Sequence, residues 1–228
     1  MTTDRMAAVA AAVERVQPGM TIGLGSGRAV FALCDALGRR WGDHPPVRVA
    51  VASGRTRARA LAAGLPLVEL DGTTLLDLAL DGADEVARDL GLIKGGGAAL
   101  LREKLVVAAA RRFVVVAEAK KLVDRLGATH PVPVEVVRFA WADTRRRLLD
   151  LVRSAALRHT PEGQPVITEE GHYLLDCAMP PEADPAALAP ALKATVGVVE
   201  HGLFLDEADE AVLGRPDGSV LQLTRSRV

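Results

Sequence analysis

The chain has 228 residues and a formal net charge of −1 at pH 7, with 49% hydrophobic and 25% charged residues. This composition suits one large or two small globular domains with a buried core. The near-zero net charge gives no field that would attract nucleic acid or an acidic membrane, so neither is an expected partner. The chain has no apolar run of membrane-spanning length, and its two cysteines are too few for a disulfide framework. We therefore expect a cytoplasmic protein.

Strands alternate with helices through the first half of the chain. Pro18-Gly19 ends an amphipathic N-terminal segment, and Gly25-Ser26-Gly27 leads from a short strand into a helix. This alternation is typical of βαβ units and predicts an α/β fold with a mostly parallel sheet. The expected helices cover residues 4–16, 28–40, a segment ending near 63, and 98–111. The expected strands cover residues 21–24, 47–52, 65–70, 75–80 and 113–117.

The segment Pro131-Val132-Pro133 interrupts this alternation. The pattern after it is strand, helix, two strands, helix and strand, which is a split α+β arrangement of the ferredoxin-like kind. We therefore expect a small α+β domain over 131–202, inserted into a larger domain formed by 1–130 plus 203–228. Its expected strands cover 134–137, 166–168, 173–177 and 197–199, and its helices cover 141–153 and a segment after Pro185. The expected tail strands, 202–205 and 211–213, return to the first sheet.

Two acids, a lysine and three glycines lie close together in the middle of the larger domain. Asp81 ends an apolar strand and Asp84 follows it, which predicts both at the carboxyl edge of the sheet, where ligands bind in open α/β folds. Lys94 leads into Gly95-Gly96-Gly97, whose amides can approach an anion closely. A simpler reading leaves the two acids as turn residues and Lys94 on the surface.

Glu103 is the strongest candidate for a proton-transferring group. On a helix it shares a face with the apolar residues Leu100 and Val107. An apolar environment raises the pKa of a carboxyl group, which suits a residue that takes and gives a proton. The alternative is a structural ion pair with the neighbouring Lys104.

Two further strand ends carry residues that can bind a ligand. Gly25-Ser26-Gly27 follows one strand and Lys120-Lys121 follows another. The first of these is either a tight turn or a phosphate cradle, because it matches neither the full dinucleotide fingerprint nor a P-loop. The five histidines have no metal-ligand spacing, so we expect no metal site.

Taken together, these motifs resemble the ribose-5-phosphate isomerase A family from end to end. The most specific are Asp81-Gly82-Ala83-Asp84-Glu85 and Lys94-Gly95-Gly96-Gly97 at their present spacing. The resemblance implies a Rossmann-like domain with a small α+β insertion, a cofactor-free reaction and a homodimer or homotetramer. It also implies interconversion of D-ribose 5-phosphate and D-ribulose 5-phosphate in the pentose phosphate pathway. Further matching segments are Gly23 to Gly27, Arg102-Glu103-Lys104, Lys121 to Asp124, Pro131 to Val136 and Gly197 to Phe204.

The resemblance also implies roles for the catalytic residues. Glu103 would carry a proton between C2 and C1 through an enediolate, while Asp81 would assist ring opening and hold sugar hydroxyls with Asp84. Lys94 and the glycine amides would stabilise the oxyanion, and Lys121 would help to neutralise the phosphate. The residues expected to contact the substrate are Ser26, Gly27, Arg28, Ala29, Asp81, Gly82, Ala83, Asp84, Lys94, Gly95, Gly96, Gly97 and Lys121.

The chain departs from the family in its first glycine loop. The family usually has Gly-Thr-Gly-Ser-Thr there, whereas this chain has Gly25-Ser26-Gly27-Arg28-Ala29 and so loses two of three hydroxyls. Arg28 either binds the phosphate in their place or marks a related isomerase of another sugar phosphate. A non-catalytic sugar-phosphate sensor and a coenzyme A transferase-like enzyme are the other open alternatives.

Overall fold

A computed structural model describes residues 2–225 of the chain. Its central sheet has six strands in the order β14-β13-β6-β3-β1-β2, all parallel except the edge strand β14. Strands β1, β3 and β6 are buried throughout, as expected of a parallel sheet covered on both faces. The six strands are β1 (Thr21–Leu24), β2 (Arg48–Val51), β3 (Leu78–Asp81), β6 (Phe113–Glu118), β13 (Glu210–Gly214) and β14 (Val220–Thr224).

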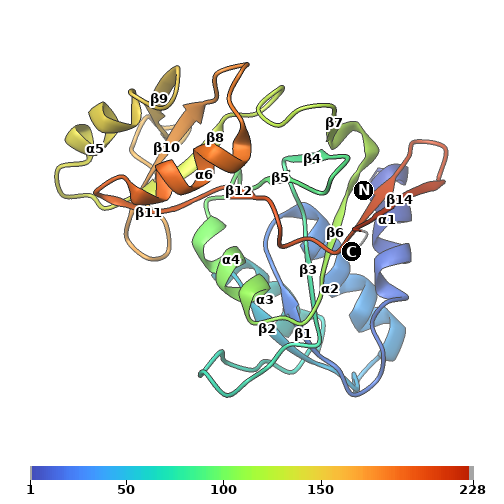
Figure 1. The fold of residues 1–228 in the computed structure, drawn as a ribbon. Coiled ribbons are helices and arrows are strands. Elements are labelled where there is room, and N and C mark those ends of the chain that lie inside the picture. Colours follow the sequence, from blue (N-terminus) through green and yellow to red (C-terminus); the bar gives the residue numbers. More distant parts are fainter. Residues whose placement is uncertain (1, 226–228) are drawn as a thin grey trace.

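Helices cover the two faces of this sheet (Figure 1). One hydrophobic core joins the sheet to α1 (Thr3–Val13), α2 (Arg28–Trp41) and α3 (Gly54–Ala62). The core on the other face contains Val106 and Val107 of α4 (Leu100–Ala108). Strand β1 has β2 on one side and β3 on the other, so the strand order reverses beside β1. Open α/β sheets bind ligands at such a reversal.

A second, antiparallel sheet forms a separate layer with its own core (Figure 1). Its strand order is β11-β8-β10-β9, with all neighbours antiparallel. It contains β8 (Val132–Val136), β9 (Ser154–Leu157), β10 (Tyr173–Ala178) and β11 (Val198–His201), with α5 (Trp141–Leu148) and α6 (Pro185–Ala194) beside it. The prediction of a mostly parallel α/β sheet with a smaller α+β part is therefore confirmed. The predicted limits of that part, 131 and 202, stay a prediction, and residues 1 and 226–228 of the larger predicted domain lie outside the described residues.

A third sheet of very short strands connects the two cores. Its order is β12-β5-β4-β7, with β4 (Glu85–Ala87), β5 (Leu92–Ile93), β7 (Leu122–Val123) and β12 (Leu203–Phe204). Successive side chains of a strand face opposite ways. Accordingly, Leu92 and Phe204 pack into the core of the central sheet, whereas Ile93 and Leu203 pack into that of the antiparallel sheet.

Several predicted elements differ in the structure. Residues 65–70 and 166–168 form only isolated bridges, Val49 to Leu67 and Ile167 to Tyr173, and Pro66 has no N–H to donate to a ladder. The predicted strand 202–205 pairs with β5 in the third sheet and not with the central sheet. The predicted helix 98–111 begins only at Leu100, because Ala98 has a φ of 64°. The predicted helices 4–16 and 141–153 end at Val13 and Leu148.

Candidate active site

The ends of β1 and β3 meet at the strand-order reversal. The amide of Gly25 donates to the carbonyl of Leu80 at 3.0 Å, and the amide of Ser26 donates to Oδ1 of Asp81 at 3.0 Å. A Cβ atom at position 25 would lie 1.8 Å from the carboxyl carbon of Asp81. Glycine is therefore required there, and its absence of a side chain lets Asp81 reach across the neighbouring strand.

Lys94 follows β5 and is buried beneath the site. Its Nζ donates to Oδ2 of Asp81 at 2.7 Å and to the carbonyl of Gly82 at 2.6 Å, and it lies 3.1 Å from Oε2 of Glu103. Burial alone would lower the pKa of Lys94, but the charges of Asp81 and Glu103 outweigh it and hold that pKa above its ordinary value. Lys94 is thus a fixed positive charge between two carboxylates.

Glu103 lies in the first turn of α4 with its carboxyl group turned inward. The side chain shares the buried face of the helix with Leu100 and Val107, as the sequence predicted, and the residue is only 4% exposed. The Lys94 ammonium group lies 3.1 Å from Oε2 of Glu103, which has no other polar partner among the described residues. Burial, and then the charge of Asp81, raise the pKa of Glu103 to about 7, although Lys94 opposes this shift. A carboxyl group that titrates near neutral pH can both accept and return a proton.

Lys104 does not pair with Glu103, although it is the next residue along the helix. Its Nζ donates to Oε1 of Glu200 at 3.0 Å and to the carbonyls of His201 and Leu203 at 2.9 and 3.0 Å. Lys104 therefore holds α4 against the chain between β11 and β12. The alternative of a Glu103–Lys104 ion pair is not what the structure contains.

The glycine loop, Gly95 to Gly97, holds Asp84 in place. Gly95 has a φ of 106°, and the amide of Gly96 donates to Oδ2 of Asp84 at 2.8 Å. A Cβ atom at position 96 would lie 2.7 Å from Oδ1 of Asp84. The close approach of backbone to carboxylate therefore needs glycine, while the predicted approach of these amides to a bound anion stays a prediction.

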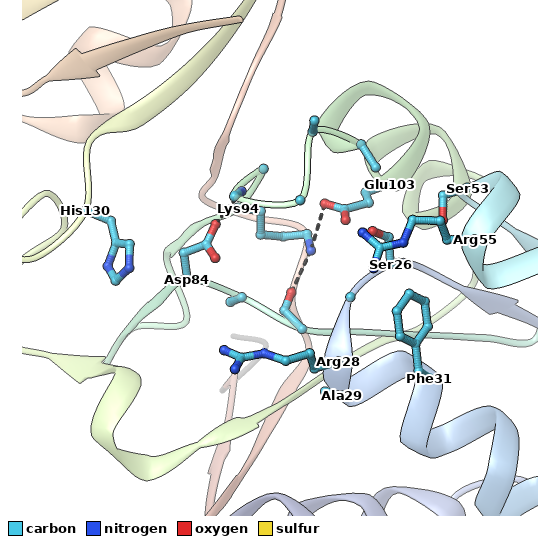
Figure 2. Close-up of a pocket in the computed structure, with 18 of the residues that line it drawn as sticks. Ser26, Arg28, Ala29, Phe31, Ser53, Arg55, Asp84, Lys94, Glu103 and His130 are labelled. Atoms are coloured by element: carbon cyan, nitrogen blue, oxygen red, sulfur yellow. Dashed lines mark hydrogen bonds and ion pairs between the residues drawn. The ribbon is translucent and has the colours of Figure 1, made fainter. Parts of the chain in front are cut away.

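These groups surround a cavity of about 550 Å³. Figure 2 shows Lys94 between Asp84 and Glu103, with a dashed line marking its ion pair to Glu103. Every predicted site residue except Asp81 lines this cavity. The carboxylate of Asp81 is buried, and its two oxygens accept from the amides of Ser26 and Gly82 and from Lys94. In this structure Asp81 therefore faces Lys94 and two backbone amides, and its expected contact with sugar hydroxyls stays a prediction.

Basic side chains line another part of the cavity wall. Arg28 extends from the start of α2 and lies below Asp84 in the view of Figure 2. Lys121, in the short 3₁₀ helix Ala119–Lys121, donates to the carbonyl of Ala83 and lies 3.7 Å from Oε2 of Glu118. Burial lowers the pKa of Lys121; the negative charges of Glu118 and Asp84 oppose this, and the smaller effects of the positive charges of Lys94 and Arg28 add to it. Neighbouring cations that repel one another form a favourable site for a phosphate group.

The family model of ribose 5-phosphate isomerase A (phosphoriboisomerase A) matches residues 48–218. The chain belongs to the ribose 5-phosphate isomerase A family. It is 49% identical over 216 residues to ribose-5-phosphate isomerase A of Synechococcus sp. (strain JA-3-3Ab), covering 94% of each chain. The ribose 5-phosphate isomerase structure from Plasmodium falciparum superposes with a TM-score of 0.92 at 31% identity, covering 99% of each chain. A D-ribose-5-phosphate isomerase in complex with phospho-erythronic acid gives a TM-score of 0.91 at 34% identity, covering 97% of each chain.

Several residues on the cavity wall of this ribose 5-phosphate isomerase A family member were not predicted. Ser53 and Arg55 follow β2 at the same edge of the sheet, so the strand-end argument could have found them. In Figure 2 Arg55 lies above Phe31, with its guanidinium carbon 5.4 Å from the ring centre. Arg5, on α1, contacts Glu118, and no local motif marks it.

The antiparallel sheet also contributes to the wall. Glu169, in the turn before β10, accepts from the amide of Gly54 at 2.8 and 3.1 Å and pairs with Arg102 beside Glu103. Glu170 pairs with the same arginine. The turn therefore joins the small sheet to α3 and α4 at the rim of the cavity.

The described residues contain neither a metal-ligand cluster nor a membrane-spanning helix. Within residues 2–225, no three His, Cys, Asp or Glu side chains are grouped as metal ligands would be. No helix in the same range is both long and apolar enough to cross a membrane. Cys34 and Cys177 are buried free thiols that form no disulfide, as the sequence suggested.

Proposed function

We propose that the chain interconverts D-ribose 5-phosphate and D-ribulose 5-phosphate, with Glu103 moving a proton between C2 and C1. The observation that carries this proposal is the buried Glu103 carboxyl group, whose pKa is raised to about 7 and whose side chain lines the cavity. A general base works best when its pKa lies near the working pH. Membership of the ribose 5-phosphate isomerase A family supports the same reaction.

In the forward direction, Glu103 removes the proton from C2 of the open-chain aldose. The electron pair of that C–H bond forms a C1–C2 double bond, and the carbonyl electrons move to O1, which gives an enediolate. Glu103 then returns its proton to C1, while the proton of the C2 hydroxyl passes to O1, leaving the ketose carbonyl at C2. No electron is gained or lost overall, so the reaction requires no redox cofactor.

Lys94 stabilises the charge that develops in this reaction. Before proton transfer, its Nζ faces the carboxylates of Asp81 and Glu103 and the Gly82 carbonyl. When Glu103 takes up a proton, it loses its negative charge, and the ammonium group of Lys94 can turn toward the enediolate oxygen. Charge stabilisation of this kind in a buried site is often the largest catalytic contribution. In this account Asp81 orients Lys94, and Asp84, which lines the cavity, holds sugar hydroxyls.

The basic side chains on the wall hold the phosphate. A phosphate monoester carries a charge of roughly −1.5 to −2 at neutral pH, which suits Arg28 and Lys121 together. A solved relative is in complex with phospho-erythronic acid, which supports a site in this chain that accepts a phosphorylated sugar derivative.

A turnover assay on a panel of pentose and hexose 5- and 6-phosphates, after EDTA treatment and without added metal, tests the proposal. Ribose 5-phosphate should have the highest kcat/KM of the panel. A clear preference for another sugar phosphate would mean that ribose 5-phosphate is not the substrate, while the proposed aldose–ketose isomerisation would still hold. Binding without turnover of any member would favour a sensor and contradict the proposal.

We also propose that the chain assembles as a homodimer or homotetramer, as its family resemblance implies. Light scattering coupled to size-exclusion chromatography measures this directly, and a monomer at micromolar concentration would contradict it. The expected cytoplasmic location and the expected absence of a cofactor stay predictions.

A further inference from the structure

Arg158 extends from the end of β9 to the glycine loop of the site. Its Nη1 donates to the carbonyl of Gly95 at 2.7 Å and, more weakly, to that of Gly96 at 3.4 Å. The other side of the guanidinium is held by Asp176 of β10, through Nε to Oδ2 at 3.0 Å and through Nη2 to Oδ1. Paired bonds of this type fix both the position and the plane of an arginine side chain. Arg158 therefore presents a firmly oriented donor to the loop.

The Gly95 carbonyl that Arg158 binds belongs to the same peptide unit as the amide of Gly96. That amide donates to Oδ2 of Asp84 at 2.8 Å. Because a peptide unit is planar and conjugated, a cationic donor on its oxygen makes its N–H a stronger donor. Asp176, Arg158, this peptide and Asp84 thus form one continuous chain of hydrogen bonds that runs from the antiparallel sheet to the cavity.

Besides Arg158, the amide of Ala98 donates to the Gly95 carbonyl at 3.1 Å, within a turn whose glycine residues have few conformational restrictions. Gly95 has a φ of 106°, and two glycines in succession impose little restriction on rotation of the plane between them. If the plane were reversed, the carbonyl oxygen of Gly95 would face the carboxylate of Asp84, and both groups would be acceptors. Arg158 and the Ala98 amide both bind the carbonyl in its present direction, and the charged guanidinium, as the stronger and closer donor, contributes most to preventing this reversal.

We propose that Arg158 is a positioning residue, which fixes the orientation of the Gly95–Gly96 peptide and thereby holds the Asp84 carboxylate against the cavity. This inference deepens the proposed function and rests on it, since Asp84 is there assigned to the sugar hydroxyls. Asp176 serves the same purpose one step further away, by holding Arg158.

Substitution of Arg158 by methionine tests this role, since methionine keeps much of the length and removes every donor. Arg158→Met should lower kcat/KM for ribose 5-phosphate by about tenfold, the loss expected for one hydrogen bond to a charged group. Arg158→Lys should restore part of it, because one donor remains. Arg145→Met is the matched control, since Arg145 donates to the backbone carbonyl of Ala155 in the same small sheet, away from the loop. The control should keep the wild-type kcat/KM.

A double-mutant cycle with Asp84→Asn separates positioning from general support of the fold. If Arg158 acts through Asp84, Arg158→Met should change kcat/KM by less than about twofold in the Asp84→Asn background, because coupled residues do not contribute independently. A full tenfold loss in that background would overturn the proposal. So would a loss in Arg145→Met as large as that in Arg158→Met.

The Gly96 amide gives a readout that does not depend on activity. Its proton resonance should move upfield in Arg158→Met, since a weaker bond to the carboxylate leaves the proton less deshielded. An unmoved resonance would overturn the positioning role. Inactivity of the wild-type chain toward every sugar phosphate would instead contradict the proposed function, so the two failures are distinguishable.

Discussion

The Nζ atom of Lys94 lies 3.1 Å from Oε2 of Glu103, and both side chains are almost entirely removed from water. Burial and the negative charge of Asp81 favour the neutral form of Glu103, whereas the positive charge of Lys94 favours the ionised form. The two effects oppose one another and leave the carboxyl group titrating near neutral pH. Proton transfer by Glu103 depends on this balance, which can be tested by changing the pH and by removing the charge of Lys94.

The first prediction is the pH dependence of the wild-type chain. Glu103 must be ionised to accept the C2 proton, and its pKa is raised from 4.5 to about 7. Activity is therefore present above this pKa and lost below it. On the acid limb of the pH profile, below this pKa, kcat/KM should fall about tenfold for each pH unit. A limb near 4.5 would contradict the raised pKa. The substrate phosphate also titrates, near a pH of about 6. The decrease caused by Glu103 can be told apart from it, because it should be absent from the pH profile of the residual activity of Glu103→Gln.

The second prediction concerns the cation. Lys94→Met removes the charge that lowers the pKa of Glu103, so the acid limb should move to higher pH, and kcat should fall because the oxyanion loses its stabilising charge. Lys104→Met is the control, since Lys104 contacts Glu200 and not Glu103. An acid limb that stays in place in Lys94→Met would show that the two groups are not coupled.

Five strands of the central sheet (β1, β2, β3, β6 and β13) could be predicted from the sequence because they are short apolar runs, whereas the edge strand β14 was not predicted. The three strands β4, β5 and β7 could not be predicted, because segments of two or three residues carry no readable alternation. The tail residues 203–204 were assigned to the wrong sheet for a related reason. Two apolar residues after Gly202 could pair with a strand of either sheet. Which sheet they join is decided by the tertiary pairing of Leu203 with Ile93.

The grouping of the candidate site residues around one cavity could be predicted, because residues at the carboxyl ends of parallel strands converge, whereas their roles stay predictions. Helical spacing was enough to place Glu103 on a buried face. The position of Asp81 behind the cavity wall was not predictable, since it results from three contacts with Ser26, Gly82 and Lys94. Arg158 was also missed, because it comes from a distant strand and acts on backbone carbonyls that have no signature in the sequence.

The third prediction tests the phosphate site. Arg28→Ala should raise the KM for ribose 5-phosphate by roughly ten- to a hundredfold, because it removes a charge-assisted contact of about 1.5–3 kcal/mol. Unphosphorylated ribose, where it is turned over, should be nearly indifferent to the change. Arg39→Ala, at the other end of the same helix, should behave as wild type. Equal, small effects of Arg28→Ala on both sugars would place Arg28 outside phosphate binding.

The fourth prediction concerns stability. A Cβ atom at position 25 would lie within 2.1 Å of the carboxyl carbon and both oxygens of Asp81, so Gly25→Ala must displace that side chain from its hydrogen bonds. The free energy of unfolding should fall by about 3 kcal/mol, the upper end of the range for overpacking. In Gly54→Ala the nearest atom to the new Cβ is 3.6 Å away, so this variant should keep the wild-type stability. Urea unfolding compares the two, and equal midpoints would contradict the required close approach.

The central claim is that Glu103 carries the proton, and Glu103→Gln tests it most directly because the amide keeps the size of the side chain and removes the base. With ribose 5-phosphate at saturation, kcat should fall by on the order of 10²–10⁴, while substrate affinity measured by calorimetry changes little. Glu182→Gln, at an exposed glutamate, should retain full turnover. A Glu103→Gln variant that keeps more than about half of the wild-type kcat would exclude Glu103 from the reaction, because loss of a general base should lower kcat far more than this.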